Sequence, residues 1–138
     1  MAIRQISVFL ENNAGRLGAV TRILAGAGVN MRAISIADTA DFGILRLIVD
    51  DNDKAMRALN DAGLTTRESD VAAVEIDDAP GGLARVMELF QQSGANIEYL
   101  YATLENKVGK AIIIFKLAEH EQGLALLKEN GLSIVERF

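Results

Sequence analysis

Asp78-Ala79-Pro80-Gly81-Gly82-Leu83 leads from an expected strand directly into an expected helix. The stretch Asn12-Asn13-Ala14-Gly15-Arg16-Leu17 makes the same transition, and the two stretches align with Gly15 on Gly81. The same shift along the chain aligns Leu17 with Leu83, Val20 with Val86, Gly28 with Gly94, Asn30 with Asn96 and Gly43 with Gly109. Glycines that keep register in this way mark repeated backbone geometry, because each occupies a place where a side chain would obstruct the chain. The chain therefore contains one structural unit twice.

The repeat predicts two units, residues 1–69 and 70–138, joined without a Gly-, Ser- or Pro-rich linker. Near the C-terminus, Gly63-Leu64 matches Gly131-Leu132, so the shift has grown by two positions there. The second unit therefore carries two extra residues, which we expect around Glu119–Gln122.

Each half is expected to run strand, helix, strand, strand, helix, strand. In the first half, Ile3–Leu10 alternates as a strand does, and Arg16–Ala27 carries apolar residues at helical spacing. Between Leu64 and Ile76 we expect two short strands, one closing the first half and one opening the second. Hairpin loops are expected near Asp38–Gly43 and Glu105–Lys110, which are rich in turn-forming residues. The fold class is therefore α+β: two ferredoxin-like βαββαβ units side by side, with antiparallel sheets and helices on one face.

Strand parity divides the apolar residues between the two faces of each sheet. The face toward the helices is expected to hold Ile6, Val8, Leu10, Ile34, Ile36, Leu45, Leu47, Val49, Val74, Ile76, Leu100, Ile113 and Phe115. The open face then carries an apolar row of Phe9, Ile48, Tyr99, Tyr101, Ile112 and Ile114. Such a row is too apolar for a solvated sheet face, so we expect a homodimer through it, with the same residues on both sides of a two-fold contact.

Composition excludes several classes of protein. Half of the residues are hydrophobic, which excludes a disordered chain, and the absence of cysteine excludes disulfides and zinc–thiolate sites. A formal net charge of −5 argues against binding the phosphate backbone of a nucleic acid. The start of the chain has no secretory apolar segment, and no apolar run reaches the roughly 18 residues of a membrane span. We therefore expect a cytoplasmic protein with neither a nucleic-acid nor a membrane partner.

Candidates for catalysis are few. The only histidine, His120, has no cysteine or serine partner nearby and is expected to be a solvated residue at a helix start. Asp50, Asp51 and Asp53 are expected to cap a helix and oppose its dipole, because their spacing does not match a calcium loop. The sequence also has no phosphate-binding loop or dinucleotide fingerprint. It therefore predicts no catalytic residue, metal or cofactor.

The two strand-to-helix loops are the best candidates for a ligand site. A glycine lets the loop backbone approach a ligand, and the unpaired N–H groups of a helix start can bind a carboxylate. A second repeated element, Gly28-Val29-Asn30-Met31 and Gly94-Ala95-Asn96-Ile97, opens the next strand of each half. We expect its amide side chain to lie near the same end of the sheet as the loop.

Asp-x-Pro-Gly-x-Leu, followed by an amphipathic helix and then by Gly-x-Asn-Ile/Met, resembles the ACT domain. The match is strongest at Asp78–Leu83 with Gly94–Ile97 and looser at Asn12–Leu17, where Ala14 stands in place of the proline. The resemblance covers essentially the whole chain, which is similar to stand-alone tandem ACT proteins of prokaryotes, including at Ala40–Arg46. It implies a regulatory module that binds an amino acid at the seam between paired units. The different loops leave open whether both are occupied.

We therefore expect a small regulatory protein that is not an enzyme and binds a small-molecule amino acid at this seam. The expected ligand-binding residues are Asn12, Asn13, Gly15, Arg16, Leu17, Asn30, Asp78, Gly81, Gly82, Leu83 and Asn96. Of the two nearby arginines, Arg16 is favoured over Arg46 to pair with the ligand carboxylate, because Arg46 falls on the open sheet face. One alternative is a trans-acting regulatory subunit that docks on a metabolic enzyme, and another is a small enzyme that uses His120.

Overall fold

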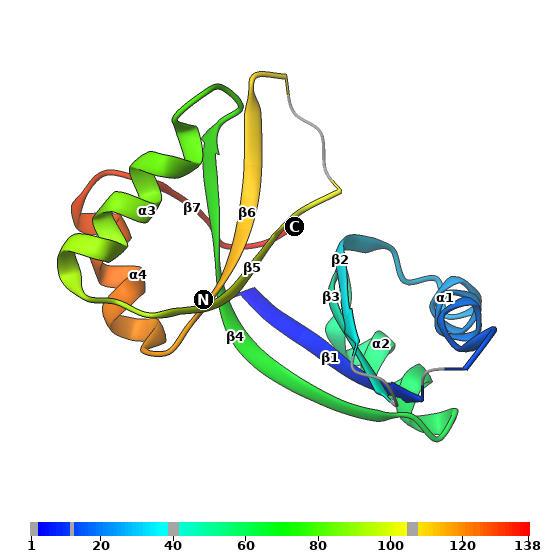
Figure 1. The fold of residues 1–138 in the computed structure, drawn as a ribbon. Coiled ribbons are helices and arrows are strands. Elements are labelled where there is room, and N and C mark those ends of the chain that lie inside the picture. Colours follow the sequence, from blue (N-terminus) through cyan, green and yellow to red (C-terminus); the bar gives the residue numbers. More distant parts are fainter. Residues whose placement is uncertain (1–2, 12, 39–41, 105–107) are drawn as a thin grey trace. The chain divides into compact units, whose positions relative to one another are not determined.

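The computed structural model describes residues 3–11, 13–38, 42–104 and 108–138. Parts of both expected hairpin loops, residues 39–41 and 105–107, lie outside the described residues. The contacts divide the chain into two compact units, Arg4–Ser69 and Asp70–Arg137, which we call the N-terminal unit and the C-terminal unit. Figure 1 shows that each unit pairs a sheet with two helices.

The N-terminal unit follows the expected βαββαβ order. Its elements are β1 (Ile3–Glu11), α1 (Arg16–Gly26), β2 (Met31–Asp38), β3 (Phe42–Val49), α2 (Asn52–Asp61) and the first part of β4 (Thr65–Asp77). The strands lie in the order β2-β3-β1-β4, and β3 is antiparallel to both β1 and β2. This is the strand order of a ferredoxin-like sheet, so the predicted fold class is confirmed for this half.

The C-terminal unit repeats that order. Its elements are the rest of β4, α3 (Gly82–Ser93), β5 (Ile97–Ala102), β6 (Lys110–Leu117), α4 (His120–Glu129) and β7 (Ser133–Val135). The strands lie in the order β5-β6-β4-β7, and all three of these pairings are antiparallel. Each strand therefore occupies the place of its counterpart in the N-terminal unit.

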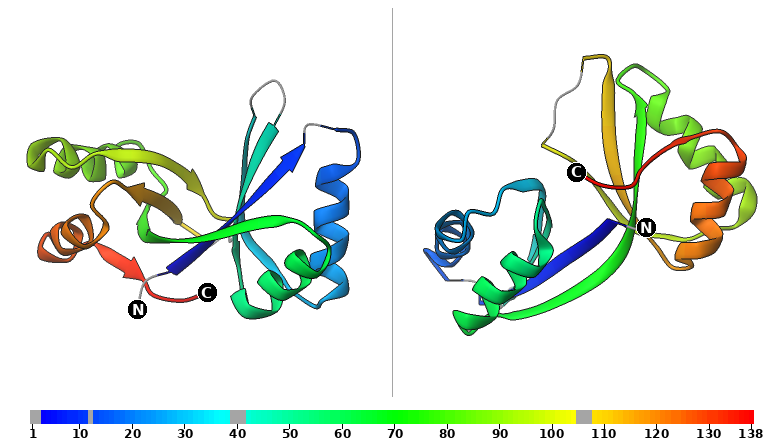
Figure 2. Two further views of the ribbon diagram at one scale, coloured as in Figure 1. Left: turned by 90° about the horizontal axis from the view of Figure 1, so that it is seen from below. Right: turned by 180° about the vertical axis from the view of Figure 1, so that it is seen from behind.

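A single strand of 13 residues, β4, stands where two short strands were expected. It is the last strand of the N-terminal unit and the first of the C-terminal unit, and Figure 2 allows it to be followed through both. No glycine or proline occurs between Thr65 and Asp77. Without a residue that favours a turn, nothing interrupts the extended backbone at the boundary between the repeats.

The register of the strands shows where the two extra residues of the C-terminal unit lie. Glu11 pairs with Phe42, and its counterpart Asp77 pairs with Lys110. Phe42 and Lys110 are therefore counterparts, and the shift between them already includes the two extra positions. Met31 pairs with Val49, and Ile97 pairs with Leu117 in the same way. Strand β5 therefore still aligns with β2 at the shift that aligns Gly15 with Gly81, without the two extra positions. The extra residues therefore lie between β5 and β6. The expected position at Glu119–Gln122 is wrong, because a hairpin loop accepts added residues with less loss of pairing than a helix start.

The same register corrects one pair of glycines. Gly43 lies opposite Leu10, and the residue opposite Ile76, the counterpart of Leu10, is Ala111. The match of Gly43 with Gly109 in the sequence is therefore not a structural equivalence.

Each unit has its own apolar core between the sheet and its helices, as strand parity predicts. The buried core of the N-terminal unit consists of Ile6, Val8, Leu10, Val20, Leu24, Val29, Leu45, Leu47, Val49, Ala55 and Leu59. That of the C-terminal unit consists of Ala72, Val74, Val86, Phe90, Ile113, Phe115, Leu117 and Leu127. Two expected core residues are instead exposed, Ile36 at 51% and Leu100 at 38%. Both belong to the edge strands β2 and β5, which have a neighbour on one side only.

The expected apolar row on the open sheet face is mostly buried within a single chain. Ile48 and Ile114 are 1% and 0% exposed, and Tyr101 and Ile112 are also buried. Gln5 on the same face is fully buried and donates a hydrogen bond from its side-chain amide to the Ser7 hydroxyl at 3.3 Å. The expectation of an open apolar row is therefore wrong. The argument for a homodimer through that row loses its basis.

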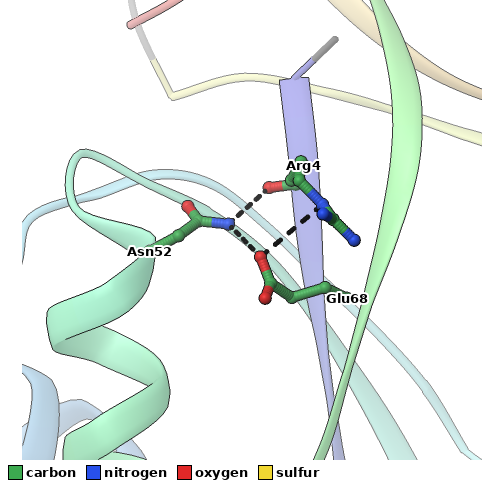
Figure 3. A network of polar contacts seen from close by, with 3 residues as sticks. All are labelled: Arg4, Asn52 and Glu68. Carbon is green, nitrogen blue, oxygen red and sulfur yellow. Dashed lines mark hydrogen bonds and ion pairs between the residues drawn. The ribbon is translucent and has the colours of Figure 1, made fainter.

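A polar network fastens the start of α2 to the sheet of the N-terminal unit (Figure 3). The Asn52 side-chain amide donates to the carbonyl oxygen of Arg4 at 3.1 Å and to Oε2 of Glu68, also at 3.1 Å. Nε of Arg4 lies 3.7 Å from the same Glu68 oxygen. One amide group therefore joins α2, β1 and β4.

Asn52→Ala is expected to destabilise the protein by about 1–2 kcal/mol, because two hydrogen bonds are lost and one of them ends on a carboxylate. Urea unfolding followed by circular dichroism measures this change. The control is Asn60→Ala, which removes one exposed bond to Thr66 and is expected to cost about half as much or less. Equal effects of the two variants would show that the network stabilises the fold no more than one exposed hydrogen bond does.

Candidate functional site

Both predicted strand-to-helix loops end in a left-handed glycine. Gly15 before α1 has φ 84°, and Gly81 before α3 has φ 89°. Within the described residues, neither helix start has a side-chain cap. Because residues with a side chain rarely adopt this conformation, the repeat of Gly15 and Gly81 reflects a shared backbone requirement.

Gly82 is required for a different reason, a close approach. A Cβ placed on Gly82 would clash with the carbonyl oxygen of Asp77, far inside van der Waals contact. The amide of Gly82 also donates to the carbonyl of Ala79 at 3.0 Å. The loop after β4 is therefore folded tightly against the end of its own strand. Its counterpart, Arg16, has a side chain, so the two loops cannot share this packing.

A pocket of about 360 Å³ opens beside the loop of the C-terminal unit, and we call it the C-terminal pocket. The end of β4, the loop Ala79–Gly82, the first turn of α3, Lys110 of β6 and the turn after α4 line it. Its charged side chains are Glu75, Asp77, Arg85 and Lys110. The pocket therefore holds two carboxylates and two cations next to glycine backbone.

The charges of this pocket act on one another. Nζ of Lys110 donates to Oδ1 of Asp77 at 2.6 Å. This hydrogen bond, then the charge of Lys110 and to a lesser degree that of Arg85, lowers the pKa of Asp77. The same bond and the charge of Asp77 raise the pKa of Lys110. Both groups are therefore ionised at neutral pH.

The N-terminal unit has a smaller pocket of about 250 Å³ at the same place, the N-terminal pocket. Phe9, Leu10, Glu11, Arg16, Phe42 and the turn after α2 line it. Arg16 Nη2 lies 3.3 Å from Oε2 of Glu11, and the Asn13 side-chain amide donates to the same oxygen at 3.0 Å. Both pockets therefore contain an acidic residue at the strand end that is paired with a base.

The residues predicted to bind a ligand fall in two places. Asn12 lies outside the described residues. The other predicted residues of the two loops lie together at the end of their own sheet: Asn13, Gly15, Arg16 and Leu17 in one unit, and Asp78, Gly81, Gly82 and Leu83 in the other. Within the described chain, no acceptor is found for the amides of Leu83 and Ala84, as expected for a helix start.

Asn30 and Asn96 lie elsewhere. The backbone N–H of Asn30 donates to Oδ1 of Asp50 at 3.0 Å, and the backbone carbonyl of Asn96 accepts from the backbone N–H of Ala118 at 3.0 Å. Both positions are at the opposite end of their sheet from the loop, because β2 and β5 run parallel to the first strand of their unit. The expectation that these amides share an end with the loop of their own unit is wrong.

Sequence reasoning missed Arg85 and Lys110, which line the C-terminal pocket. Lys110 reaches the loop only because β6 pairs with β4 and places it opposite Asp77. Arg85 lies one helical turn after the glycines, and a cation at that spacing was the available signal.

His120 is the first residue of α4, but both ring nitrogens are buried without a hydrogen-bond partner among the described residues. The expected solvated residue is thus not found. His120 lines neither of the two pockets. No group of three or more potential metal-binding side chains occurs in residues 3–11, 13–38, 42–104 and 108–138. Nor is any helix in that part of the chain long and apolar enough to cross a membrane.

Lys110→Met is expected to raise the pKa of Asp77 toward its ordinary value of 3.8, because the hydrogen bond and the positive charge are both removed. In the wild type, the ionised carboxylate stabilises the fold above that value, and this contribution is lost as the pH falls through the lowered pKa. An NMR titration of the Asp77 carboxyl measures both values. Lys116→Met is the control, since Lys116 pairs with Glu98 instead. An Asp77 titration unaltered by Lys110→Met would contradict the ion pair.

The family model for the ACT domain pair matches residues 1–137 of the chain. Among solved structures, a protein from Bacteroides thetaiotaomicron is 37% identical, with 98% of this chain and 92% of that chain covered and a TM-score of 0.92. None of the curated proteins compared with the chain matches it.

Two more distant structures share the fold. They are regulatory subunits of aspartate kinase from Thermus thermophilus, in a ligand-free form, and from Thermus flavus. Their identities are 20% and 21%, and their TM-scores are 0.67 and 0.62; in each case 91% of this chain and 90% of the other chain are covered. The family model and the 37% identical structure both span almost the whole chain, and the chain therefore belongs to the ACT family as a pair of ACT domains.

Proposed function

We propose that this protein is an amino-acid-sensing regulator made of two ACT domains, residues 1–69 and 70–138. The observation that carries the proposal is the C-terminal pocket, where two cations and two carboxylates surround the glycine backbone of an ACT loop. A free amino acid carries one positive and one negative group on neighbouring atoms. A pocket with separated charges of both signs complements that arrangement.

The proposed binding mode follows from the positions of the charges. The ligand carboxylate pairs with Arg85 and Lys110 and approaches the backbone of Gly81, beside which no described atom lies within 4 Å of the place of a Cβ. Its ammonium group pairs with Asp77. An analogue that lacks the carboxylate loses its contacts with Arg85 and Lys110, and one that lacks the ammonium group loses its contact with Asp77, which gives selectivity for the α-amino acid head group.

That the ligand binds at the seam between two ACT units stays a prediction. Asn30 and Asn96 lie away from the loop of their own unit, so each can join the proposed site only as a residue of a neighbouring unit. The pairing of units that the ACT resemblance implies would supply such a neighbour.

The regulatory role needs a second protein that responds to the bound state, and we propose a metabolic enzyme of the cytoplasm for it. We do not assign catalysis to this chain. The homodimer also stays a prediction, now without the apolar row to motivate it. Sedimentation velocity at micromolar concentration tests it.

A thermal-shift screen of the twenty standard L-amino acids tests the proposed function. A ligand at about 100 times its dissociation constant is expected to add about 2.7 kcal/mol of stability. Arg85→Ala should weaken binding of the best amino acid by about 10- to 150-fold, because a charge-assisted contact to the carboxylate is lost.

The matched control is Lys128→Ala, which removes an exposed cation of α4 outside the C-terminal pocket. Its affinity is expected to equal that of the wild type. If none of the twenty amino acids shifts the melting temperature, the proposed function is wrong.

A further inference from the structure

The N-terminal and C-terminal pockets are the same pocket built twice. Once the two extra hairpin residues are allowed for, every residue that lines the N-terminal pocket has a counterpart that lines the C-terminal pocket. Examples are Glu11 with Asp77 and Gly63 with Gly131. The duplication therefore provides an internal comparison in which the side chains can be matched one by one.

The chemistry of the two pockets differs at three of these places, and Arg85 adds a fourth difference because its counterpart does not line the N-terminal pocket. Phe9 and Phe42 of the N-terminal pocket replace Glu75 and Lys110. Arg16 replaces Gly82, and the counterpart of Arg85 is Ala19. The C-terminal pocket thus has two cations beside Asp77, whereas the N-terminal pocket has one cation beside Glu11.

The single cation of the N-terminal pocket is already engaged. Arg16 pairs with Glu11 at 3.3 Å, and Asn13 donates to the same carboxylate oxygen. In the C-terminal pocket, Lys110 pairs with Asp77. The side chain of Arg85 makes no hydrogen bond or ion pair with any described residue, and its charge helps to lower the pKa of Asp77. A ligand carboxylate, as a second anion beside the carboxylate of the pocket, therefore has a cation available only in the C-terminal pocket.

The two pockets share an open glycine but differ in the residues beside it. The space where a Cβ would stand on Gly81, and on its counterpart Gly15, has no described atom within 4 Å. In the N-terminal pocket, Arg16 with its side chain stands at the place of Gly82. The exposed ring of Phe42 replaces the ammonium group of Lys110. This second exchange removes a charge that could hold a carboxylate.

We propose that the chain binds one amino acid per chain, in the C-terminal pocket only, and that the exchanges Lys110/Phe42 and Arg85/Ala19 determine this asymmetry. The inference rests on the proposed function and specifies which copy of the site performs it. The N-terminal pocket keeps the left-handed glycine of the ACT loop, but its one cation is paired with Glu11 and it is lined by Phe9 and Phe42.

Isothermal titration calorimetry of the full chain, with the amino acid that gives the largest thermal shift, measures the number of ligands bound per chain. One equivalent per chain is expected. Lys110→Phe, which imports the residue of the N-terminal pocket, should weaken binding by about 10- to 150-fold. Phe42→Ala, the control in the N-terminal pocket, should leave affinity and stoichiometry unchanged. Lys110→Met serves as a second variant if Lys110→Phe does not fold.

Amide NMR shifts locate the bound ligand directly. The amides of Gly81 and Gly82 are expected to move on titration, and that of Gly15 is expected to stay in place. Two equivalents per chain, or a shift of Gly15 equal to that of Gly81, would overturn the asymmetry while leaving the proposed function intact. Absence of binding by all twenty amino acids would instead contradict the proposed function itself.

Discussion

A backbone turn that only glycine adopts readily stands at the start of the first helix of each ACT unit. Gly15 and Gly81 reverse the chain with φ of 84° and 89°, so that the helix begins immediately after the loop. The helix then lies over the sheet and buries Val20 and Leu24, or Val86 and Phe90. Both cores, and the pocket beside each loop, depend on this reversal.

The repeated glycines and the alternation of the strands made most of the fold predictable. Ile6, Val8 and Leu10 lie on the helix side as parity requires, and the βαββαβ order is found in both units. These features are local, since each depends on neighbours in the sequence. The family and the fold class followed from them.

Features that depend on pairing between distant segments were not predictable in the same way. The place of the extra residues became clear only from Asp77 lying opposite Lys110. Ile36 has the parity of a core residue, but it lies on an edge strand and is exposed. The sequence also contained no signal that Ile48 and Ile114 would be buried. In the site, the two loops and Arg16 were found from the sequence, whereas Arg85 and Lys110 were not.

The 13-residue strand β4 means that the repeat in the sequence does not mark a place where the chain can be divided. A cut after Ser69 would sever a continuous strand, and each fragment would end or begin in the middle of a sheet. The N-terminal fragment would present a shortened edge strand beside β1, and the C-terminal fragment would begin with the central strand that holds both β6 and β7. Loss of structure in β4 would affect both sheets at once. The two domains are therefore expected to melt as one cooperative unit, even though each has a core of its own.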